Sequence, residues 1–459
     1  MSIIYDNKIS IIGTGYVGLV SGICLADFGN QIINVDIDEE KISLLQEGGM
    51  PIYEPGLQEV FDRNREERIR FTTDLEGAIK ESEVIFIAVG TPDDGQGAAD
   101  LSNVFTVAQE IGQHMDGYRV VVTKSTVPVG TGVKVEETIK AALKERGVSY
   151  DFDVVRNPEF LREGKGVHDF THPDRIVIGT NSERARSILQ EVYRALYLNE
   201  VPFIFTTRAT AEIIKYASNA FLATKISFIN QMANLCDRAG GNVQHVARAM
   251  GMDGRISSKF LHPGPGYGGS CFPKDTKAIV QAARELGVDL SVIRAGIEAN
   301  ERQKLLMVEK IEAALGDLQG KKLGILGLTF KPDTDDLRES PSLTIIPELI
   351  MRGASIQAYD PQGIEVAALR LEKYEQNILY RASEYEVMKG AEALILLTEW
   401  NQFRRLNLKK VRELLEDPPV FFDLRNVYRR EEVEAQGIEY HGVGVPAIEE
   451  KLEEQLKEE

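Results

Sequence analysis

The chain has 459 residues, a length typical of about three domains. Hydrophobic residues make up 43% and charged residues 27%, which excludes a disordered or low-complexity chain. The formal net charge of −18 disfavours binding to nucleic acid or to an anionic membrane surface. The chain has no apolar run of roughly 18 residues, no recognisable signal peptide and only three scattered cysteines. We therefore expect a cytoplasmic protein that neither enters a membrane nor depends on disulfides.

The N-terminal part alternates short apolar runs with helical patterns. Residues 8–12 are predicted as a strand, a glycine turn follows, and residues 19–28 have a helical pattern. Residues 31–35 are predicted as a second strand, and further apolar runs follow at 84–89 and 120–123. Strands that alternate with helices predict a parallel sheet with crossover helices.

The glycine turn has the sequence GTGYVG, residues 13–18, between a predicted strand and a predicted helix. Glycines in this pattern permit the tight turn and the approach of a pyrophosphate, which the helix N-terminus attracts. Asp36 closes the next strand, where a carboxylate accepts hydrogen bonds from ribose hydroxyls and repels a 2′-phosphate. The sequence therefore predicts NAD rather than NADP, and the alternative is a turn without a ligand. For Lys41 there are two alternatives: its side chain contacts the ribose, or it is solvated.

A long helix is predicted between about residues 207 and 239, because proline is absent and apolar residues recur three and four apart. Helical residues continue to about Ala314, apart from a glycine-rich stretch at 262–271. Lys215 and Asn219 are four residues apart on the long helix and share a face. A lysine and an amide together can hold a water or an alkoxide, and the alternative is a solvated face.

The glycine-rich stretch continues into Cys271, Lys274 and Asp275. A loop of this composition brings backbone N–H groups close to a ligand. A thiol near a lysine, peptide dipoles and an oxidised cofactor is biased toward the nucleophilic thiolate. The alternative is a small buried cysteine, which we expect for Cys24 and Cys236 in their apolar helical patterns.

Near Lys321 the first pattern returns, with a strand at 322–326, a helix at 342–352 and a strand at 355–359. This second strand ends in an aspartate, as the strand at 31–35 does, which indicates a second nucleotide-binding-like half. The predicted fold class is α/β, with two Rossmann-like doubly wound parallel-sheet domains joined by a long central helix and a helical middle domain. We place the domains at 1–206, 207–315 and 316–459. Residues 448–459, with six Glu and two Lys, are expected to form a solvated helical tail.

Seven features in chain order resemble the UDP-glucose/GDP-mannose dehydrogenase family over about residues 8–445. They are GTGYVGL, VGTP, KSTVPVGT, NPEFLREG, the Lys215/Asn219 helix, GYGGSCFPKD and GLTFKPDTDDLRESP. Within the family, GGSCFPKD and FLREG most resemble members that act on UDP-glucose. GDP-mannose and UDP-N-acetylhexosamines are the alternative substrates. The resemblance implies oxidation of a primary alcohol to a carboxylate with two NAD⁺ and one water, and a homodimer.

The resemblance also implies roles for single residues. Lys215 and Asn219 would stabilise an oxyanion, and Cys271 would attack the aldehyde to give a thiohemiacetal and then a thioester. Water ordered by Glu159, Thr126 and Asp275 would hydrolyse it, and the base of each step stays open. Cofactor contacts are implied for Gly13, Gly15, Tyr16, Val17, Gly18, Asp36, Lys41, Thr91, Thr126, Glu163, Lys274 and Arg338. Substrate contacts are implied for Glu159, Phe160, Leu161, Arg162, Glu163, Lys215, Asn219, Arg255, Phe260, Leu261, His262, Pro263, Gly264, Gly268, Lys331 and Arg425.

Arg255 resembles an arginine that crosses a dimer interface to the substrate phosphate. No metal site is predicted.

Two rival functions share parts of this pattern. A two-electron hydroxy-acid type dehydrogenase shares the N-terminal motif but needs neither Cys271 nor residues 321–445. A non-catalytic NAD-binding sensor would turn over no nucleotide sugar.

Overall fold

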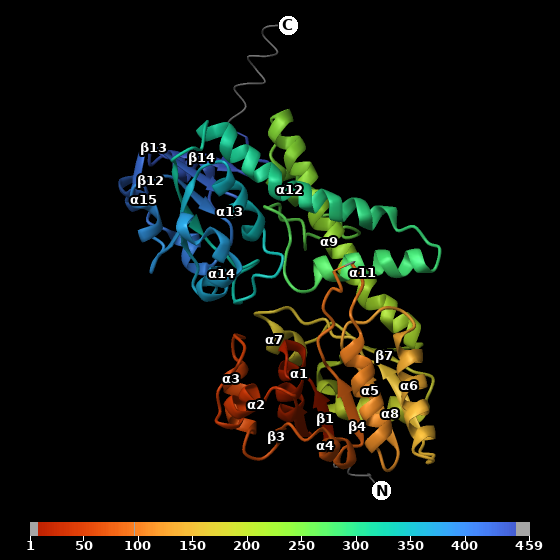
Figure 1. Cartoon of the computed structure of the whole chain (residues 1–459). Coiled ribbons are helices and arrows are strands. Elements are labelled where there is room, and N and C mark those ends of the chain that lie inside the picture. Colours follow the sequence, from red (N-terminus) through yellow and green to blue (C-terminus); the bar gives the residue numbers. More distant parts are fainter. Residues whose placement is uncertain (1–7, 96, 447–459) are drawn as a thin grey trace. The chain divides into compact units, whose positions relative to one another are not determined.

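The computed structural model describes residues 8–95 and 97–446 (Figure 1). The predicted tail at 448–459 lies outside the described residues. The described chain packs as two compact units. The first runs to Ser218 and includes Gln281–Val288, and the second comprises Asn219–Val280 and the residues from Asp289 onward.

The first unit is built on an eight-stranded sheet with the order β3-β2-β1-β4-β5-β6-β7-β8, in which β6 and β7 pair antiparallel and the other neighbours are parallel. Its strands are β1 (Lys8–Ile12), β2 (Gln31–Val35), β3 (Ile69–Thr72), β4 (Val84–Ile87), β5 (Arg119–Thr123), β6 (Phe152–Arg156), β7 (Ile176–Gly179) and β8 (Phe203–Thr206). Its helices are α1 (Tyr16–Asp27), α2 (Glu39–Gln46), α3 (Leu57–Asn64), α4 (Leu75–Glu81), α5 (Ser102–His114), α6 (Thr131–Glu145), α7 (Gly166–Thr171) and α8 (Glu183–Val192), followed by the 3₁₀ turn η1 (Arg194–Asn199).

Alternating strand residues bury both faces of this sheet. In β4, Val84 and Phe86 pack into the cluster that includes α1, α3 and α8, whereas Ile85 and Ile87 pack against α4, α5 and α6. Successive side chains of a strand point to opposite faces, so a continuous apolar run produces a strand covered by helices on both sides. The unit is therefore doubly wound, as Figure 1 shows for α1 and α5 around β1 and β4.

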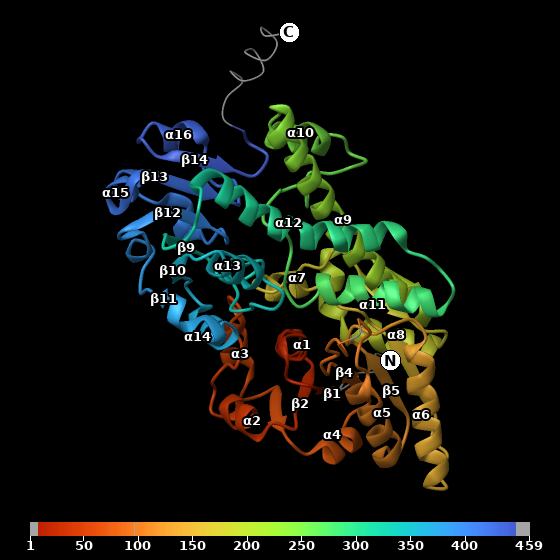
Figure 2. The same ribbon diagram turned by 45° about the horizontal axis from the view of Figure 1, so that its top comes forward.

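The second unit holds an all-parallel six-stranded sheet with the order β11-β10-β9-β12-β13-β14. Its strands are β9 (Lys322–Leu326), β10 (Ser355–Tyr359), β11 (Ile378–Tyr380), β12 (Ala391–Leu396), β13 (Leu415–Asp423) and β14 (Glu439–Gly442). Helices α13 (Ser342–Met351) and α14 (Ile364–Arg370) pack on one face, and α15 (Leu408–Leu414) and α16 (Arg430–Glu434) on the other (Figure 2). Short 3₁₀ turns are η2 (Glu372–Asn377), η3 (Glu386–Met388) and η4 (Asn401–Arg405).

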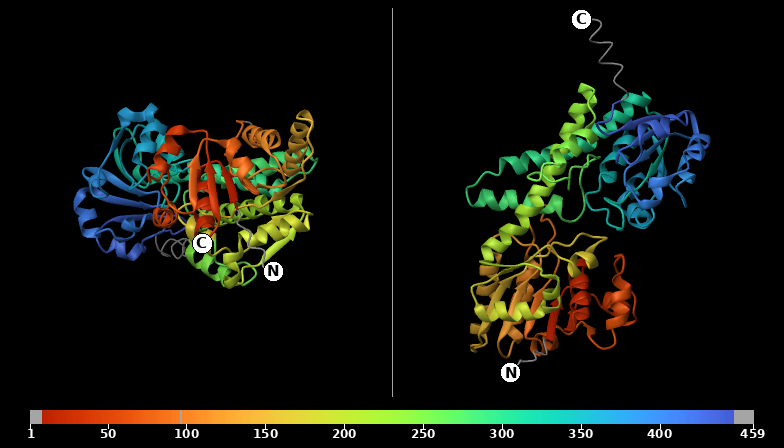
Figure 3. Two further views of the ribbon diagram at one scale, coloured as in Figure 1. Left: turned by 90° about the horizontal axis from the view of Figure 1, so that it is seen from below. Right: turned by 180° about the vertical axis from the view of Figure 1, so that it is seen from behind.

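The stretch of chain from β8 to β9 contains α9 (Arg208–Ala239), α10 (Val243–Gly251), α11 (Phe272–Glu285) and α12 (Ser291–Leu315). Helix α9 is a single uninterrupted helix, as the view from behind in Figure 3 shows. The boundary between the two compact units falls within it, after Ser218. The predicted division at 206 and 315 stays a prediction.

The predicted fold class is confirmed, and several predicted strands have the observed bounds. Strands β1, β2, β9 and β10 begin and end at the residues expected from the apolar runs. The long helix predicted at 207–239 is α9, and the glycine-rich stretch lies between α10 and α11.

The second sheet repeats the order of the first six strands of the first sheet but uses its strand-ending aspartate differently. Asp360 Oδ2 accepts hydrogen bonds from the N–H of Leu328 at 2.7 Å, the N–H of Thr329 at 3.1 Å and Trp400 Nε1 at 3.1 Å. Its Oδ1 accepts the N–H of Gly363 at 2.8 Å. Asp360 is almost fully buried, so its carboxylate holds the ends of its own sheet together.

Candidate active site

The GTGYVG turn connects β1 to α1 and is closed on its inner side. The N–H of Gly13 donates to Val35 O at 2.8 Å. A Cβ on Gly18 would lie 1.9 Å from Gly13 O, so only glycine permits this packing. A Cβ on Gly15 would meet nothing within 4 Å. The turn is therefore open at the N-terminus of α1, where a pyrophosphate can approach the backbone.

Asp36 follows β2 and is fixed by Thr14 from within the glycine turn. Thr14 donates from its N–H at 2.7 Å and from Oγ1 at 2.6 Å to Asp36 Oδ2. Burial raises the pKa of Asp36, but the hydrogen bonds from Thr14 outweigh burial and hold the pKa below its ordinary value. Asp36 Oδ1 faces the N–H of Asp38 at 3.2 Å. Lys41 Nζ lies 3.9 Å from Asp36 Oδ2. Contact between Lys41 and the ribose stays a prediction.

The ends of β4 and β5 bring two predicted cofactor residues together. Thr91 Oγ1 donates to Thr126 O at 2.9 Å, and Ser125 Oγ donates to Val89 O at 2.6 Å. The carboxyl ends of parallel strands meet at one edge of a sheet, which is where ligands bind in open α/β folds. Thr91 and Thr126 therefore lie at the same sheet edge as the glycine turn.

Glu159 and Lys215 form a buried ion pair between the loop after β6 and helix α9. Lys215 Nζ lies 2.7 Å from Glu159 Oε1, and both side chains are at most 5% exposed. The N–H of Leu161 donates to Glu159 Oε2 at 2.6 Å. Burial raises the pKa of Glu159, but Lys215 and this N–H outweigh burial and hold the pKa below its ordinary value. The pair therefore places a charged carboxylate beside a lysine amine in the interior of the first unit.

Lys124 is a buried lysine beside this pair and is not among the predicted site residues. Its Nζ donates to Asn157 Oδ1 at 3.0 Å and to Tyr193 Oη at 3.3 Å. Burial lowers the pKa of Lys124 to about 7, with Glu159 opposing the shift. Lys124 belongs to KSTVPVGT and Asn157 to NPEFLREG, so both residues lie in recognised motifs. Only the fold brings the two side chains into contact.

The residues around Cys271 form a second group, at the start of α11. Cys271 is partly buried, directly precedes α11 and has Ser270 Oγ 3.4 Å from its Sγ. Asp275 in the first turn of α11 is fully buried. Asn219 Nδ2 on α9 donates to Asp275 Oδ2 at 2.6 Å, and Lys274 Nζ donates to Asp275 Oδ1 at 2.6 Å. The structure thus joins three predicted site residues, Asn219, Lys274 and Asp275, in one hydrogen-bonded group.

Buried amide side chains hold the glycine-rich loop before Cys271. Asn230 Oδ1 on α9 accepts the N–H of Gly264 at 2.8 Å, and Gln303 Nε2 on α12 donates to Gly264 O at 2.9 Å. Asn300 on α12 accepts the N–H of Tyr267 at 2.8 Å and donates to its carbonyl at 3.1 Å. The N–H groups of Gly264 and Tyr267 therefore donate to side chains of the protein. Ligand contacts by the rest of the loop stay a prediction.

The predicted residues of the second α/β half lie at its strand ends and loops. Arg425 Nε, after β13, donates to Leu397 O at 2.6 Å, and its Nη2 donates to Phe330 O at 3.1 Å. Arg338 pairs with Asp336 at 2.8 Å. Arg255, whose side chain is 90% exposed, pairs with Asp253 at 2.7 Å. Their ligand contacts stay predictions.

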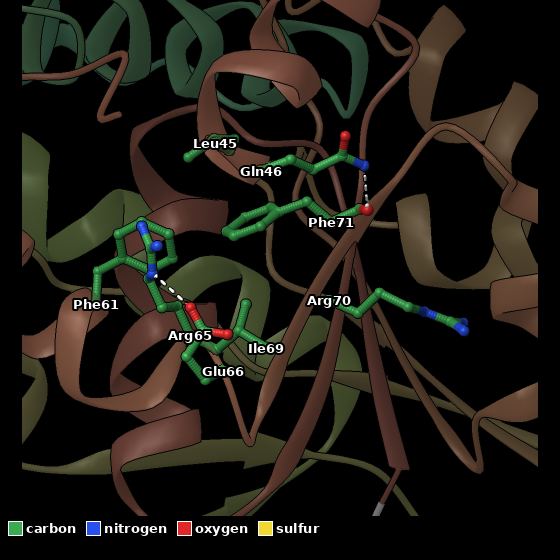
Figure 4. A pocket seen from close by; sticks show the side chains of 8 residues that line it. All are labelled: Leu45, Gln46, Phe61, Arg65, Glu66, Ile69, Arg70 and Phe71. Carbon is green, nitrogen blue, oxygen red and sulfur yellow. Dashed lines mark hydrogen bonds and ion pairs between the residues drawn. The ribbon is translucent and has the colours of Figure 1, made fainter. Parts of the chain in front are cut away.

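Lys215 belongs to the first group of residues and Asn219 to the second, and the two are four residues apart on α9. Residues four apart on a helix are neighbours on one face. The hollow in Figure 4 is separate from both groups and contains no predicted site residue. It is lined by Leu45, Gln46, Phe61, Arg65, Glu66, Ile69, Arg70 and Phe71.

Comparison with known proteins gives three consecutive family matches. Sequence models of the UDP-glucose/GDP-mannose dehydrogenase family match residues 7–197 as its NAD binding domain, 209–302 as its central domain and 324–430 as its UDP binding domain.

Relatives and solved structures cover nearly the whole chain. UDP-glucose 6-dehydrogenase of Rhizobium meliloti (strain 1021) is 50% identical over 444 residues, 96% of this chain and 100% of the relative. UDP-glucose 6-dehydrogenase TuaD of Bacillus subtilis (strain 168) is 47% identical, over 96% of this chain and 94% of the relative. The structure of a UDP-glucose dehydrogenase from Pyrobaculum islandicum superposes with a TM-score of 0.87 at 36% identity, over 95% of this chain and 98% of that one.

Proposed function

The chain belongs to the UDP-glucose/GDP-mannose dehydrogenase family, and from this premise we propose that it oxidises UDP-glucose at C6 to UDP-glucuronate, using two NAD⁺ and one water. It is an NAD-dependent oxidoreductase. The names of the relatives support UDP-glucose as the substrate. The observation that carries the proposal is the Asn219–Asp275 hydrogen bond of 2.6 Å in the turn that follows Cys271.

The open turn at Gly15 and the charged carboxylate of Asp36 suit the pyrophosphate and the adenosine ribose of NAD. Bound NAD⁺ supplies the acceptor for the hydride that leaves the substrate carbon. Thr14 holds Asp36 through Oδ2, and Asp36 Oδ1 accepts the N–H of Asp38 at 3.2 Å. Thr91, Thr126, Glu163, Lys274 and Arg338 are the further cofactor contacts that we propose.

In the first oxidation the C6 hydroxyl loses a proton while negative charge develops on its oxygen. The ammonium of Lys215 and the amide of Asn219 stabilise that oxygen. Glu159 stays ionised because Lys215 lies 2.7 Å away, so it can accept a hydrogen bond from the hydroxyl or from a water. Asp275, in the first turn of α11, is a second acceptor for such a hydrogen bond, and either carboxylate can accept the proton.

In the second oxidation the Cys271 thiolate attacks the aldehyde carbon and forms a C–S bond. The thiohemiacetal then loses a hydride from C6, for which the second NAD⁺ would be the acceptor, together with the proton of its hydroxyl, and becomes a thioester. Water held by Glu159, Thr126 and Asp275 then adds to the carbonyl, the C–S bond breaks, and the thiol is regenerated with release of the carboxylate. Covalent attachment retains the reactive aldehyde until the second oxidation is complete.

A NADH-release assay over UDP- and GDP-sugars tests this proposal. We expect two NADH for each UDP-glucose consumed, because the carbon loses four electrons. One NADH per substrate would contradict the proposal and favour a two-electron dehydrogenase. Faster turnover of GDP-mannose or a UDP-N-acetylhexosamine would replace the proposed sugar, and no turnover would favour a binding protein.

Replacing Asp36 with asparagine and Ile37 with arginine is expected to shift cofactor preference toward NADP by about tenfold or more. The asparagine retains an acceptor for Thr14 while removing the charge that repels a 2′-phosphate. Ile37 is 93% exposed, so an arginine there can reach a phosphate without disturbing the core. The ratio of kcat/KM for NADP and NAD measures the shift. Glu39→Gln, at an exposed site, is the control, and an unchanged ratio in the double variant would remove Asp36 from the ribose site.

We also infer a homodimer and a cytoplasmic location. Helix α9 exposes Phe221, Phe228 and Leu235 by 66%, 42% and 58%, and their spacing of seven residues aligns them in an apolar stripe that a second copy can cover. Sedimentation analysis should give twice the chain mass, and the mass of one chain would contradict the dimer. The chain has only three cysteines, scattered along the sequence, which suits a reducing compartment, and cell fractionation tests this. Among the described residues, no helix is both long and apolar enough to span a bilayer.

A further inference from the structure

Glu54 is a buried carboxylate of the first unit, placed in the loop before α3, with 7% of its surface exposed. Its Oε2 accepts Tyr16 Oη at 2.5 Å and the N–H of Gly164 at 2.7 Å. Its Oε1 accepts the N–H of Gly166 at 2.7 Å. A single side chain therefore satisfies donors from two segments more than a hundred residues apart in the sequence.

The two segments are the cofactor turn and the sugar loop of the proposed function. Tyr16 is the first residue of α1 and part of GTGYVG. Gly164 directly follows the loop Glu159–Glu163, and Gly166 begins α7. Tyr16 Oη also lies 3.2 Å from Arg162 O, so the tyrosine touches the loop directly as well.

The junction is tightly packed. A Cβ on Gly166 would lie 2.3 Å from Tyr16 Oη, so the loop approaches the tyrosine as closely as a glycine allows. Burial raises the pKa of Tyr16 far above its ordinary value, and the hydrogen bond to Glu54 raises it further. The hydroxyl is therefore a permanent donor, and hydrogen bonds to a carboxylate are roughly twice as strong as neutral ones.

We propose that Glu54 is a positioning residue that couples cofactor binding to nucleotide-sugar binding. The coupling rests on the proposed function, which assigns the turn to NAD and the loop to the sugar. A cofactor bound at the N-terminus of α1 restricts the movement of Tyr16. Because Glu54 Oε2 accepts hydrogen bonds from both Tyr16 and Gly164, the loop that contains Gly164 becomes restricted as well. Oε1 holds Gly166 in the same way. The sugar orders the same junction from the other side, because coupling between two binding equilibria is reciprocal.

Titration calorimetry with UDP-glucose, in the presence and absence of saturating NADH, tests the coupling without turnover. For the unmodified chain we expect NADH to tighten UDP-glucose binding by about fivefold or more. In Glu54→Gln the factor should fall to near one, because the amide offers only one acceptor oxygen. A purely structural role would weaken both ligands and leave the factor unchanged.

Two further variants separate the links. Tyr16→Phe removes the donor on α1 but leaves Gly164 and Gly166 bonded to Glu54. It should abolish the coupling while the N–H groups of both glycines stay protected from hydrogen exchange, and in Glu54→Gln that protection should also fall. Glu59→Gln makes the same chemical change at an exposed site on α3 and should leave the factor as it was. If Glu54→Gln does not fold, as judged by circular dichroism, Tyr16→Phe decides.

The outcomes distinguish this inference from the function on which it rests. Failure of the unmodified chain to bind UDP-glucose overturns the proposed function. Binding of both ligands with no mutual tightening overturns the coupling, and so does a factor that persists in the folded Glu54→Gln and Tyr16→Phe variants.

Discussion

Replacing Cys271 with serine is expected to lower UDP-glucuronate formation by about a thousandfold or more, because the variant loses the nucleophile of the second oxidation. Serine is the poorer nucleophile, and its product with the aldehyde would lead to an ester instead of a thioester. The first oxidation does not need the thiol. We therefore expect any NADH released in a single turnover to stop at one per UDP-glucose.

The measurement is NADH absorbance beside chromatographic analysis of the sugar product. Ser270→Ala is the neighbouring control, because Ser270 Oγ lies 3.4 Å from the Cys271 Sγ and its loss leaves the thiol in place. That variant should still release two NADH per UDP-glucose. Normal acid formation by Cys271→Ser would contradict the covalent mechanism while leaving the four-electron reaction intact.

Replacing Lys215 with methionine is expected to give the second large effect, on both stability and turnover. The buried Glu159 carboxylate would lose the ammonium at 2.7 Å, and breaking a buried ion pair costs about 3 kcal/mol or more in the free energy of unfolding. The developing oxyanion would lose a cation as well, so kcat should fall by about a hundredfold or more.

The stability loss should depend on pH. In the unmodified chain the pKa of Glu159 lies below its ordinary value, so the pair contributes stability above the unfolded-state pKa, and this is lost as pH falls through the folded-state pKa. Without Lys215, burial raises the pKa of Glu159 above the unfolded value, which destabilises the fold at neutral pH. The difference between the two proteins should therefore be largest near pH 7 and shrink below the ordinary glutamate pKa of about 4.3.

Denaturant unfolding at pH 7 and at pH 4 measures this difference. Lys144→Met removes an exposed lysine of α6 and should change the free energy of unfolding by less than about 0.5 kcal/mol at both pH values. A Lys215→Met protein as stable as the unmodified chain at pH 7 would show that Glu159 is not held as a buried ion.

The amino-acid sequence by itself determined the fold class and the motifs that supply the residues of the site. Strands such as 8–12 and 322–326 were predictable to the residue, because their apolar runs are bounded by turns that local chemistry specifies. The glycine turn, α9 and the loop before Cys271 were predictable for the same reason: each is a motif in which all the informative residues are close together in the chain.

Only the tertiary structure decided which polar groups become partners. Asp36 and Asp360 end equivalent strands, yet Thr14 holds the first beside an open glycine turn, while Leu328, Thr329 and Trp400 engage the second inside its own sheet. Glu54 lies in none of the recognised motifs, and Lys124 lies in one that does not reveal its partners.

The physical reason is the range of the interactions. Local patterns specify strands and helices through hydrophobic periodicity and backbone conformation, which act over a few residues. The state of a buried charge depends on the donors and acceptors that surround it after the chain has folded. Those of Glu54 come from residues 16, 164 and 166, and only the packed sheet and its loops bring them to one carboxylate.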